Sequence, residues 1–351
     1  MRRSKQQRIR SAASMSGMMR NACFCLWASI IMFSACDRRP LEDPGDAVSV
    51  QVSVDVRTIP NVTTSIYNAK IPVPTIEPEM MRVLFYNKYT KTIAAESYIS
   101  DITTDEDGNR CLQGTIGIRP GTYEMLIYNF DTESTQIRND QSFATIEAFT
   151  SPISASLASR FQSRTNSNTD ILYEPDHLVV ARNEAETIPY HEDVHVIRTV
   201  ATTIVETYYL QIKVQGLSYV SGARAILNGM VGTNRFGKNE RVTDPPAAIY
   251  FTLQKSDDNG VDVLATIFNT FGRIDNSTNN LSVTFDIRTT DGRTIQRDFD
   301  ISHLFSTEAC IKHHWLLLEE TITIDPPTTP NGGGFDPKVD DWEDERHDID
   351  L

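Results

Sequence analysis

The sequence predicts an all-β protein made of two tandem antiparallel β-sandwich domains. Two segments, Val48–Val56 and Tyr208–Val214, alternate apolar and polar residues with the period of two that a half-buried strand requires. The pairs Asn259-Gly260 and Asp291-Gly292 predict hairpins, since their residues tolerate the backbone angles of tight turns. No long amphipathic helix pattern occurs in the body of the chain, which completes the prediction of an all-β fold.

The N-terminus has the form of an export signal. Residues 1–20 contain six Lys and Arg residues and no acid, and the apolar run Ala22–Ala35 follows. A basic segment before a short apolar run is typical of a signal peptide, and the run is too short for a comfortable membrane span. The small residues before Cys36 resemble the lipobox of bacterial lipoproteins, with Phe33 in the place of the usual Leu. The resemblance implies cleavage before Cys36 and two acyl chains on its thiol, enough for lasting membrane attachment. The alternatives are an ordinary signal peptide with an incidental cysteine, or an uncleaved anchor.

Processing before Cys36 would leave a strongly acidic body. It removes six basic residues and no acid, so 27 Lys and Arg remain against 47 Asp and Glu, a formal net charge of −20. Phosphates and anionic head groups would repel such a body, so a nucleic acid is not expected as a partner. Outside the cytoplasm Cys111 and Cys310 could pair, or they could remain two buried thiols. The sequence leaves both open.

Composition divides the chain into five parts. Residues 1–35 are the signal peptide, and residues 36–46, with two prolines and a glycine, predict a lipidated tether. An N-terminal β-sandwich domain is predicted over residues 47–187 and a C-terminal one over residues 188–326, each long enough to bury a core. A Pro/Gly linker and an acidic-aromatic tail fill residues 327–351.

Further strands are predicted between turn signals. Each is a short run rich in the β-branched and aromatic residues that favour strands. Asp107-Gly108 and Pro120-Gly121 mark turns, Ala155–Phe161 predicts one short helix, and residues 162–170 predict a surface loop. The predicted strands are Arg82–Tyr86, Lys91–Ile99, Cys111–Ile118, Thr122–Asn129, Leu178–Ala181, Val194–Val214 as a longer strand region, Leu281–Arg288, Thr294–Ile301 and Leu316–Ile324.

The tail combines acidic and apolar residues. Residues 335–351 contain eight acids against two basic residues. A tail that only interacts with solvent needs no large apolar side chains, so the pattern predicts an extended segment that lies along a partner. The predicted partner-strand contacts are Phe335, Val339, Trp342, Ile349 and Leu351.

The segment from His191 to His195 is a literal H-E-x-x-H, the helical zinc motif of metallopeptidases. The β-branched residues that follow it favour a strand, on which the two histidines would stand about 13 Å apart, too far to share one zinc ion. Glu206 is a possible third ligand but has no supporting motif. The histidines are therefore interpreted as surface residues of a strand or linker.

Three other segments have simpler explanations than a functional site. Residues 105–109 could hold calcium, but a solvated hairpin turn accounts for the same carboxylates. The glycine-rich segment 229–237 lacks the lysine and serine of a phosphate-binding loop. His313 and His314 are expected on a strand, where adjacent side chains point to opposite faces. We predict no catalytic residue, metal or cofactor, and therefore no enzyme.

Four segments together resemble a group of Bacteroidetes lipoproteins related to fimbrillins. They are Cys36–Arg39 with the Val-alternating strand after it, Pro120–Asn129 (PGTYEMLIYN), Ala223–Gly232 (ARAILNGMVG) and Gly332–Trp342 (GGGFDPKVDDW). The resemblance implies two transthyretin-like β-sandwich domains of the fimbrial type. It also implies a protein held on the outer membrane by its lipid, with fimbrillin-like subunits as partners. Which side of the membrane the protein faces is left open.

The resemblance implies a mode of assembly as well. In such fibres one subunit donates a terminal strand to a groove in its neighbour, and a protease opens the groove by cutting after an arginine near the first strand. Arg57 stands where such a cut could occur, whereas anchor members keep the lipid and the first strand. An anchor or accessory subunit is therefore the predicted function. The alternative is a surface lipoprotein that binds a glycan or host ligand, for which Trp315 and Trp342 are the only tryptophans outside the signal.

Overall fold

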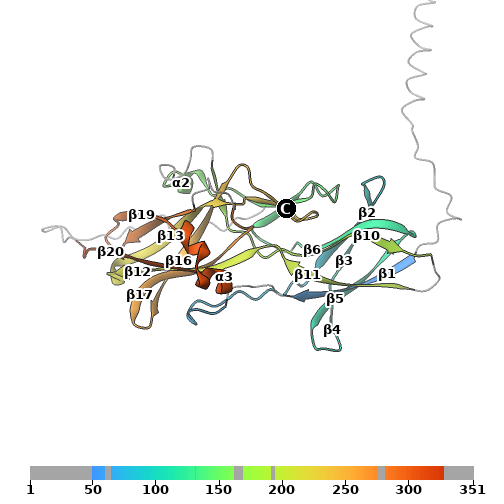
Figure 1. Ribbon diagram of the computed structural model, residues 1–351, viewed down its shortest axis with the longest axis horizontal. Helices are drawn as coiled ribbons and strands as arrows, with labels where there is room; N and C mark the ends of the chain where they lie inside the picture. Colours follow the sequence, from blue (N-terminus) through green and yellow to red (C-terminus); the bar gives the residue numbers. More distant parts are fainter. Residues whose placement is uncertain are drawn as a thin grey trace, which may run out of the picture. The chain divides into compact units, whose positions relative to one another are not determined.

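The computed structural model describes residues 50–59, 65–130, 132–161, 169–190, 194–274 and 281–327. Strands are the main regular structure of these residues and helices are few, which confirms the predicted all-β class (Figure 1). The described helices are short: α2 (Ala155–Ala158), α3 (Glu308–His313), and the 3-10 helices η1 (Leu217–Tyr219) and η2 (Ser302–Ser306). Within the described ranges, no helix is both long enough and apolar enough to cross a membrane.

The first sheet has eight strands in the order β3-β2-β6-β10-β11-β1-β5-β4. Their bounds are β1 Val50–Ile59, β2 Met81–Asn87, β3 Ile93–Ile99, β4 Asp101–Thr104, β5 Arg110–Ile118, β6 Gly121–Asn129, β10 Val179–Ile188 and β11 His195–Thr203. The sheet curls so that its edge strand β3 comes close to β5. The Ser97 hydroxyl of β3 donates to the Thr115 carbonyl of β5 at 3.4 Å. Ile99 packs so closely on Gly114 that an added Cβ there would lie 2.4 Å from Ile99 Cγ2. The curled sheet encloses its own apolar core.

The second sheet has seven strands in the order β19-β18-β13-β16-β17-β12-β20, with β9 pairing to β16 off this path. Their bounds are β9 Asp170–Tyr173, β12 Glu206–Gln215, β13 Val220–Met230, β16 Ala247–Asp258, β17 Val261–Thr270, β18 Ser282–Thr289, β19 Thr294–Asp300 and β20 Trp315–Thr323. Strand β16 changes partner along its length: Ala247–Leu253 pair with β13, and Gln254–Asp258 pair with β17. The strands enclose a larger core, which η2 and α3 join through Phe305 and Cys310.

A third, four-stranded sheet has the order β15-β14-β8-β7. Its strands are β7 Thr135–Arg138, β8 Glu147–Thr150, β14 Thr233–Arg235 and β15 Glu240–Val242. Below it, Tyr128 of β6 meets Phe236 with ring centroids 5.1 Å apart, in a core cluster that also contains Phe143 and Phe271. Segments far apart in the sequence therefore share one core here.

Both predicted hairpins are confirmed. Asn259 (φ 52°) and Gly260 (φ 86°) form the turn between β16 and β17, and a two-residue turn of this kind requires positive φ at both positions. The pair Asp291-Gly292, with Gly292 at φ 83°, lies between β18 and β19, whose strands match the prediction within two residues.

The predicted strands are confirmed with small shifts of most ends, and the strand predicted over Leu178–Ala181 continues to Ile188 as β10. The first begins at Val50 and extends to Ile59, and the region 194–214 divides into β11 and β12. The predicted helix shortens to the four residues of α2, and residues 162–168 of the predicted loop lie outside the described residues. Cys111 and Cys310 are both buried and are not joined in a disulfide, so they are two separate thiols.

The predicted division between residues 187 and 188 stays a prediction. The described strands all lie in one unit, which spans Ser49–Leu351. Strand β11 follows the predicted division and pairs with β1 and β10 in the first sheet, whereas β9 precedes it and pairs with β16 in the second. Each half therefore contributes a strand to the sheet of the other half, and the two halves are connected by backbone hydrogen bonds. That each half has a transthyretin-like topology also stays a prediction.

Candidate functional site

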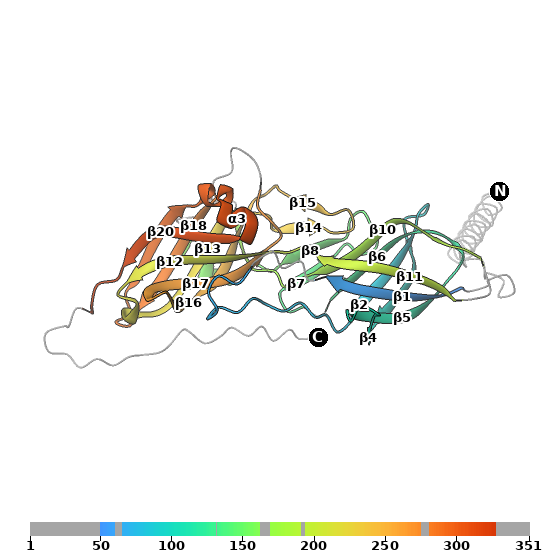
Figure 2. The same cartoon turned by 60° about the horizontal axis from the view of Figure 1, so that its bottom comes forward.

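Strand β1 lies inside the first sheet, between β11 and β5 (Figure 2). It pairs in parallel with β11 from Val52 to Ile59 and antiparallel with β5 from Val50 to Arg57. The Val56 side chain is fully buried in the core of the sheet. Without β1, the edges of β5 and β11 would lose their hydrogen-bonding partner, and an unpaired edge is a template for a strand from another chain.

The backbone of Arg57 is paired on both sides. It lies opposite Cys111 of β5 and Val200 of β11. A peptide bond in a paired interior strand is a poor protease substrate, since cleavage favours accessible loops and opened segments. Processing after Arg57 would therefore require β1 to open, or would have to precede folding. Cleavage at this position stays a prediction.

The other predicted site residues lie outside the described residues. These are the lipidation site and the five partner-strand contacts, namely Cys36, Phe335, Val339, Trp342, Ile349 and Leu351. Their roles stay predictions. The last described residue, Pro327, lies four residues after the end of β20. Just before it, the Arg293 guanidinium donates to the carbonyls of Asp325 (2.9 Å) and Pro326 (3.3 Å). The last described residues therefore have a defined path.

A segment between β1 and β2, residues 65–71, is fastened to the second sheet; we call it the strap. The Tyr67 ring lies 5.0 Å from the Tyr209 ring and 4.8 Å from the Trp315 ring. Its hydroxyl donates to Asp258 at 3.0 Å, and Ile71 is buried beside these rings. The connection that leaves the first sheet after β1 is thus packed on the face of β12, β17 and β20.

Polar contacts complete the strap. The Asn68 amide donates to the Asp257 carbonyl at 2.9 Å, Lys70 forms an ion pair with Asp257, and the Trp315 indole N–H donates to the Ser65 carbonyl at 2.9 Å. Sequence analysis missed the strap, because it has neither strand nor helix periodicity.

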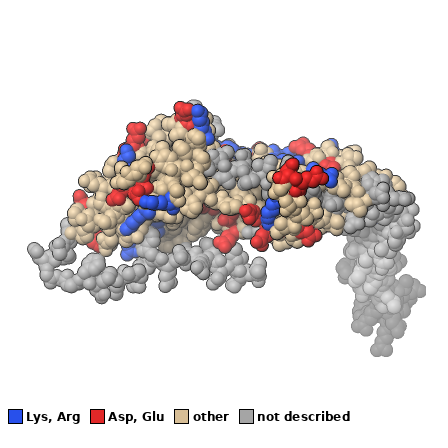
Figure 3. All heavy atoms as spheres, turned by 90° about the horizontal axis from the view of Figure 1, so that it is seen from below, with Lys and Arg blue, Asp and Glu red and all other residues tan. Residues whose placement is uncertain are grey.

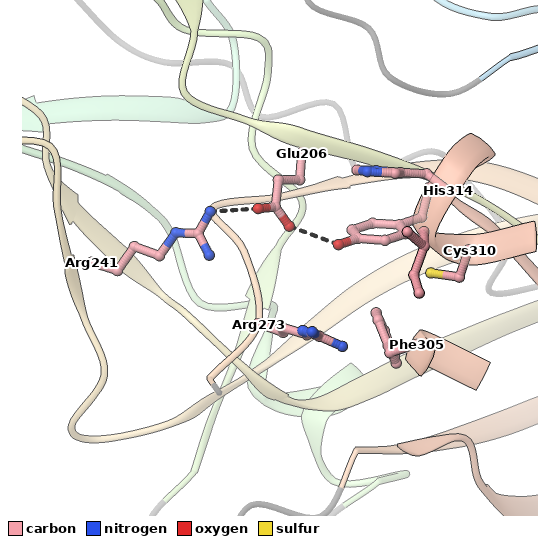
Figure 4. Close-up of a pocket in the computed structure, with 8 residues that line it drawn as sticks. Glu206, Arg241, Arg273, Phe305, Cys310 and His314 are labelled. Atoms are coloured by element: carbon pink, nitrogen blue, oxygen red, sulfur yellow. Dashed lines mark hydrogen bonds and ion pairs between the residues drawn. The ribbon is translucent and has the colours of Figure 1, made fainter. Parts of the chain in front are cut away.

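A cavity of about 190 Å³ opens beside the start of β12 (Figure 4). Strands β12 and β15, the segment after β17 and the η2–α3 segment supply its walls. The lining residues are Glu206, Tyr208, Arg241, Arg273, Phe305, Cys310, Ile311 and His314. Sequence analysis weighed Glu206 only as a zinc ligand and did not identify the cavity, because its residues come from distant segments.

Glu206 organises the polar side of this cavity. One carboxylate oxygen accepts from Arg241 and the other accepts from the Tyr208 hydroxyl at 2.7 Å, as Figure 4 shows for the Arg241 pair. Gly272 makes room for this arrangement, since an added Cβ would lie 2.5 Å from Arg241 Cζ. Arg273 lies over the Phe305 ring, 5.2 Å from its centroid.

Burial keeps two other lining groups neutral. It raises the pKa of the Cys310 thiol to about 11, a shift that the Arg273 charge opposes and the Glu206 charge increases. It also raises the pKa of the Tyr208 hydroxyl strongly, again reinforced by Glu206. A thiol that stays protonated is a poor nucleophile, so the cavity is better suited to binding than to covalent chemistry.

The expected strand at His313 and His314 is wrong. His313 ends helix α3, and His314 caps it in the left-handed conformation (φ 56°). Thr307 begins the helix, its side chain accepting the Cys310 N–H at 3.2 Å. The pair Thr307-Glu308 is a helix-start signal that the sequence contains, but the adjacent apolar run favoured a strand. His314 stacks on Tyr208 with centroids 4.7 Å apart and so forms one wall of the cavity.

The remaining candidate segments fall into ordinary structural elements. His195 begins strand β11, whereas residues 191–193 lie outside the described residues. Asp105 accepts from the backbone N–H of Asp107 (3.0 Å) and of Asn109 (2.7 Å), as a hairpin turn requires. Among the described residues, no group of three or more His, Cys, Asp or Glu side chains could hold a metal ion.

Charged side chains of both signs are mixed on the face that Figure 3 shows. On the face in Figure 3, Asp and Glu side chains stand among Lys and Arg side chains, and the acids do not gather into a single patch. Glu147 illustrates the pairing, since it accepts from Arg138 at 2.8 Å and from Arg235 at 3.0 Å. By contrast, the tail concentrates eight acids in seventeen residues.

Comparison with known proteins places these features in a family context. Residues 69–252, 184 of the 351, match the model described as "Domain of unknown function (DUF5119)". The chain is 26% identical over 243 residues to the "Putative fimbrium anchoring subunit Fim4B" of Bacteroides ovatus, a match that covers 69% of this chain. The same match spans only 63% of that relative's length.

Solved structures have a similar fold. A crystal structure described as a "putative adhesin" from Bacteroides ovatus aligns with a TM-score of 0.56 and 20% identity, over 79% of this chain and 94% of that one. The fimbrial anchor protein Mfa2 from Porphyromonas gingivalis aligns with a TM-score of 0.44 and 12% identity, over 76% of this chain and 88% of that one. The predicted resemblance to fimbrial anchor proteins is confirmed by the match to the Bacteroides ovatus relative.

Proposed function

This chain belongs to the DUF5119 family, and on that premise we propose that it is a non-enzymatic lipoprotein of the cell envelope. Its role is to serve as the anchor or an accessory subunit of a fimbria-like surface assembly. The name of the Bacteroides ovatus relative supports this role. The observation that carries it is the place of β1, the strand nearest the lipid, inside the first sheet between β5 and β11.

The position of β1 bears on which end of an assembly the chain occupies. A subunit that accepts a donated strand needs an open groove, and here β1 fills the space between β5 and β11. A chain that keeps β1 cannot accept a donated strand between β5 and β11. It would therefore be the terminal subunit of the assembly. Acylation of Cys36 in the outer membrane would make that end the anchored one.

The tail is the proposed donor. Edge pairing gives affinity through main-chain hydrogen bonds, and alternate side chains entering pockets give specificity. On an extended strand Phe335 and Val339 would fall on one face and Trp342 on the other, each with an acid as a direct neighbour in the sequence. The fixed path of Asp325 and Pro326 would start the tail from a constant place.

A second candidate function is the binding of a glycan or host ligand. Tyr98 and Phe130 are exposed by 52% and 37%, and their rings lie 5.1 Å apart. Two exposed aromatic rings beside Glu96, which accepts from the Tyr98 hydroxyl at 3.0 Å, offer apolar faces and a hydrogen-bond acceptor to a sugar. Retention on immobilised polysaccharide that is lost in Tyr98→Ala would favour this function.

Deletion of residues 332–351 tests the proposed role of the tail. We expect the deleted protein to reach the membrane but to lose its co-purifying β-rich subunits. A matched variant keeps the tail length and the acids, and replaces Phe335, Val339, Trp342, Ile349 and Leu351 by Ser. It should lose the same subunits, because apolar contacts carry the pairing. Unchanged assembly in both variants would contradict the proposal.

A further inference from the structure

We propose that one end of the first sheet contacts a zwitterionic lipid surface, and that Tyr89 and Tyr190 are the side chains that enter its head-group region. We call this end the rim; it consists of residues 87–92, Tyr190 and residues 194–196. The inference rests on the proposed attachment of the chain to a membrane near Cys36. It goes beyond that attachment, because it states which part of the folded body meets the lipid.

Strand pairing brings several strand ends together at the rim. Strand β1 begins there, with Val50 opposite Ile118 at the end of β5. Strand β11 runs parallel to β1 and therefore begins at the same end (Figure 2). Strand β10 ends there, because its last residue, Ile188, lies opposite Gly121 at the start of β6. The rim is thus the end of the sheet at which the chain enters from its N-terminal side.

The turn between β2 and β3 presents Tyr89 in a fixed conformation. Asn87 lies opposite Tyr123, near the start of β6, which places this turn at the rim. The Asn87 side-chain oxygen accepts the backbone N–H of Tyr89 at 2.9 Å and of Thr90 at 3.0 Å. The Asn87 carbonyl accepts the N–H of Lys91 at 2.8 Å. Tyr89 is nevertheless 83% exposed, so an ordered turn holds its ring out in the solvent.

Tyr190 supplies a second exposed ring, beside two exposed valines. Tyr190 follows the end of β10 by two residues and is 69% exposed. Val194 and Val196, at the start of β11, are 49% and 44% exposed. Among the large hydrophobic side chains that the structure describes, Tyr89 and Tyr190 are the two most exposed. A tyrosine combines an apolar ring with a polar tip, which suits the boundary between head groups and water.

The charges around the rim favour a zwitterionic surface over an anionic one. Lys91 forms an ion pair with the buried Glu124 at 2.9 Å. In the sequence, the connections that meet at the rim carry as many basic as acidic residues once Glu124 is included, namely Lys88, Lys91 and Arg119 against Glu124, Glu192 and Asp193. A balanced set of charges gives no strong attraction to anionic head groups. The contact is therefore assigned to the rings and the valines.

The length of chain before β1 brings the rim within reach of the bilayer. Val50 follows Cys36 by 14 residues. A chain of that length reaches at most about 50 Å, and a flexible one spans about 20 Å on average. Such a tether gives the rim a high local concentration at the lipid surface, so contacts that are weak in solution can form. The β4–β5 turn is at the other end of β5, because it precedes Arg110.

Fluorophores at two turns of the first sheet test the contact. The protein is the chain from residue 36, with Cys36→Ser and a histidine tag before it. It is held by a nickel-chelating lipid on phosphatidylcholine vesicles. Residues Ser49–Leu351 form one unit, which this chain keeps whole. An environment-sensitive fluorophore is attached at Thr90→Cys in the rim or at Glu106→Cys in the β4–β5 turn. Labelling is selective, because Cys111 and Cys310 are buried.

A nitroxide on the lipid head groups is the quencher. Because side chains at a membrane interface enter it by only about 5–10 Å, we expect the label at residue 90 to be quenched at least about threefold more strongly than the label at residue 106. Equal quenching of the two labels overturns the inference, since the body would then have no preferred contact with the lipid.

A double variant identifies the two rings. Tyr89→Ser with Tyr190→Ser should reduce quenching at residue 90 to the level at residue 106. Val261→Ser with Ile311→Ser is the matched control, because these side chains are 47% and 68% exposed and belong to the second sheet and helix α3. It should leave quenching unchanged. Full quenching in the tyrosine variant, with thermal unfolding unchanged, would overturn the role of the rings.

These outcomes are separable from those of the proposed function. The nickel-chelating lipid replaces the acyl chains, so the labels report on the rim whether or not Cys36 is acylated in the cell. An unacylated native N-terminus would end the lipoprotein proposal and leave the quenching result unchanged. An acylated Cys36 together with equal quenching would keep the anchor and overturn the inference about the rim.

Discussion

Val56 of β1 lies opposite Leu112 of β5, and both side chains are buried in the core of the first sheet. The first strand after Cys36 is therefore part of the core that holds this sheet together. Its loss would remove apolar contacts as well as hydrogen bonds on both of its edges. This is the physical reason to expect a folded anchor to keep β1.

Val56→Ala should lower the free energy of unfolding by about 2 kcal/mol, since it deletes two buried methyl groups and leaves a cavity. Urea denaturation measures the change. Val196→Ala on the neighbouring strand is the matched control, because Val196 is 44% exposed, and it should change stability by less than about 0.5 kcal/mol. Equal effects in the two variants would mean that β1 does not contribute to the core.

Gly216 fixes the end of β20. Its φ is +86°, and an added Cβ would lie 2.3 Å from the Ile324 carbonyl oxygen. Gly260 has the same φ, but nothing lies within 4 Å of its added Cβ. Both alanine variants bear the left-handed strain of about 1–2 kcal/mol, and only Gly216→Ala adds a clash with backbone. We expect Gly216→Ala to have the lower melting temperature by several degrees, and the reverse order would refute this account.

The buried ion pair of Arg224 and Asp286 should matter more than an exposed one. The Arg224 Nε–Asp286 Oδ2 distance is 2.9 Å, and the side chains are only 9% and 3% exposed. Asp286→Ala leaves a buried guanidinium without its carboxylate, which should cost about 3–5 kcal/mol. Glu308→Ala breaks the exposed pair with Lys312 on α3 and should cost less than about 1 kcal/mol. Chemical denaturation of both variants gives the comparison.

Glu174 should make stability depend on pH. Burial raises the pKa of its carboxyl from 4.5 to about 7, despite the N–H that Asn269 donates at 2.9 Å. Between these values the folded chain keeps a proton that the unfolded chain has lost, so stability falls as the pH rises through this window. Glu174→Gln removes that penalty. We expect it to be more stable than the natural chain at pH 8, by up to about 3 kcal/mol, and no more stable at pH 4.

Thermal unfolding between pH 4 and pH 8 checks this prediction. Glu106→Gln, at an exposed position in the β4–β5 turn, controls for the loss of one formal negative charge. If the Glu174 and Glu106 variants show parallel curves, burial of Glu174 does not control the pH dependence.

Local patterns predicted much of the fold. Two residues were enough to predict the β16–β17 turn, because Asn259 and Gly260 tolerate the positive φ that it requires. The period of two identified β12. However, Tyr209 lies on the face that this period predicts to be exposed to solvent, and it is buried. That face is covered by the strap through Tyr67, a contact between segments more than 140 residues apart in the sequence. Periodicity within one strand does not reveal such a partner.

The elements that were missed are short or irregular. Strands β14 and β15 have three residues each, too few for any periodicity. The parallel pairing of β1 with β11 joins distant segments, which a single sequence does not reveal. The cavity was missed for the same reason, since Glu206 and Arg273 meet only after the second sheet has folded.

The central claim is that this chain is a lipid-held anchor that keeps its first strand. Its most direct test is the mature N-terminus and intact mass of the protein taken from native membranes. We predict a chain that begins at an acylated Cys36 and still contains β1. A chain that begins at Thr58, without lipid and without β1, would contradict the claim and indicate a polymerising subunit.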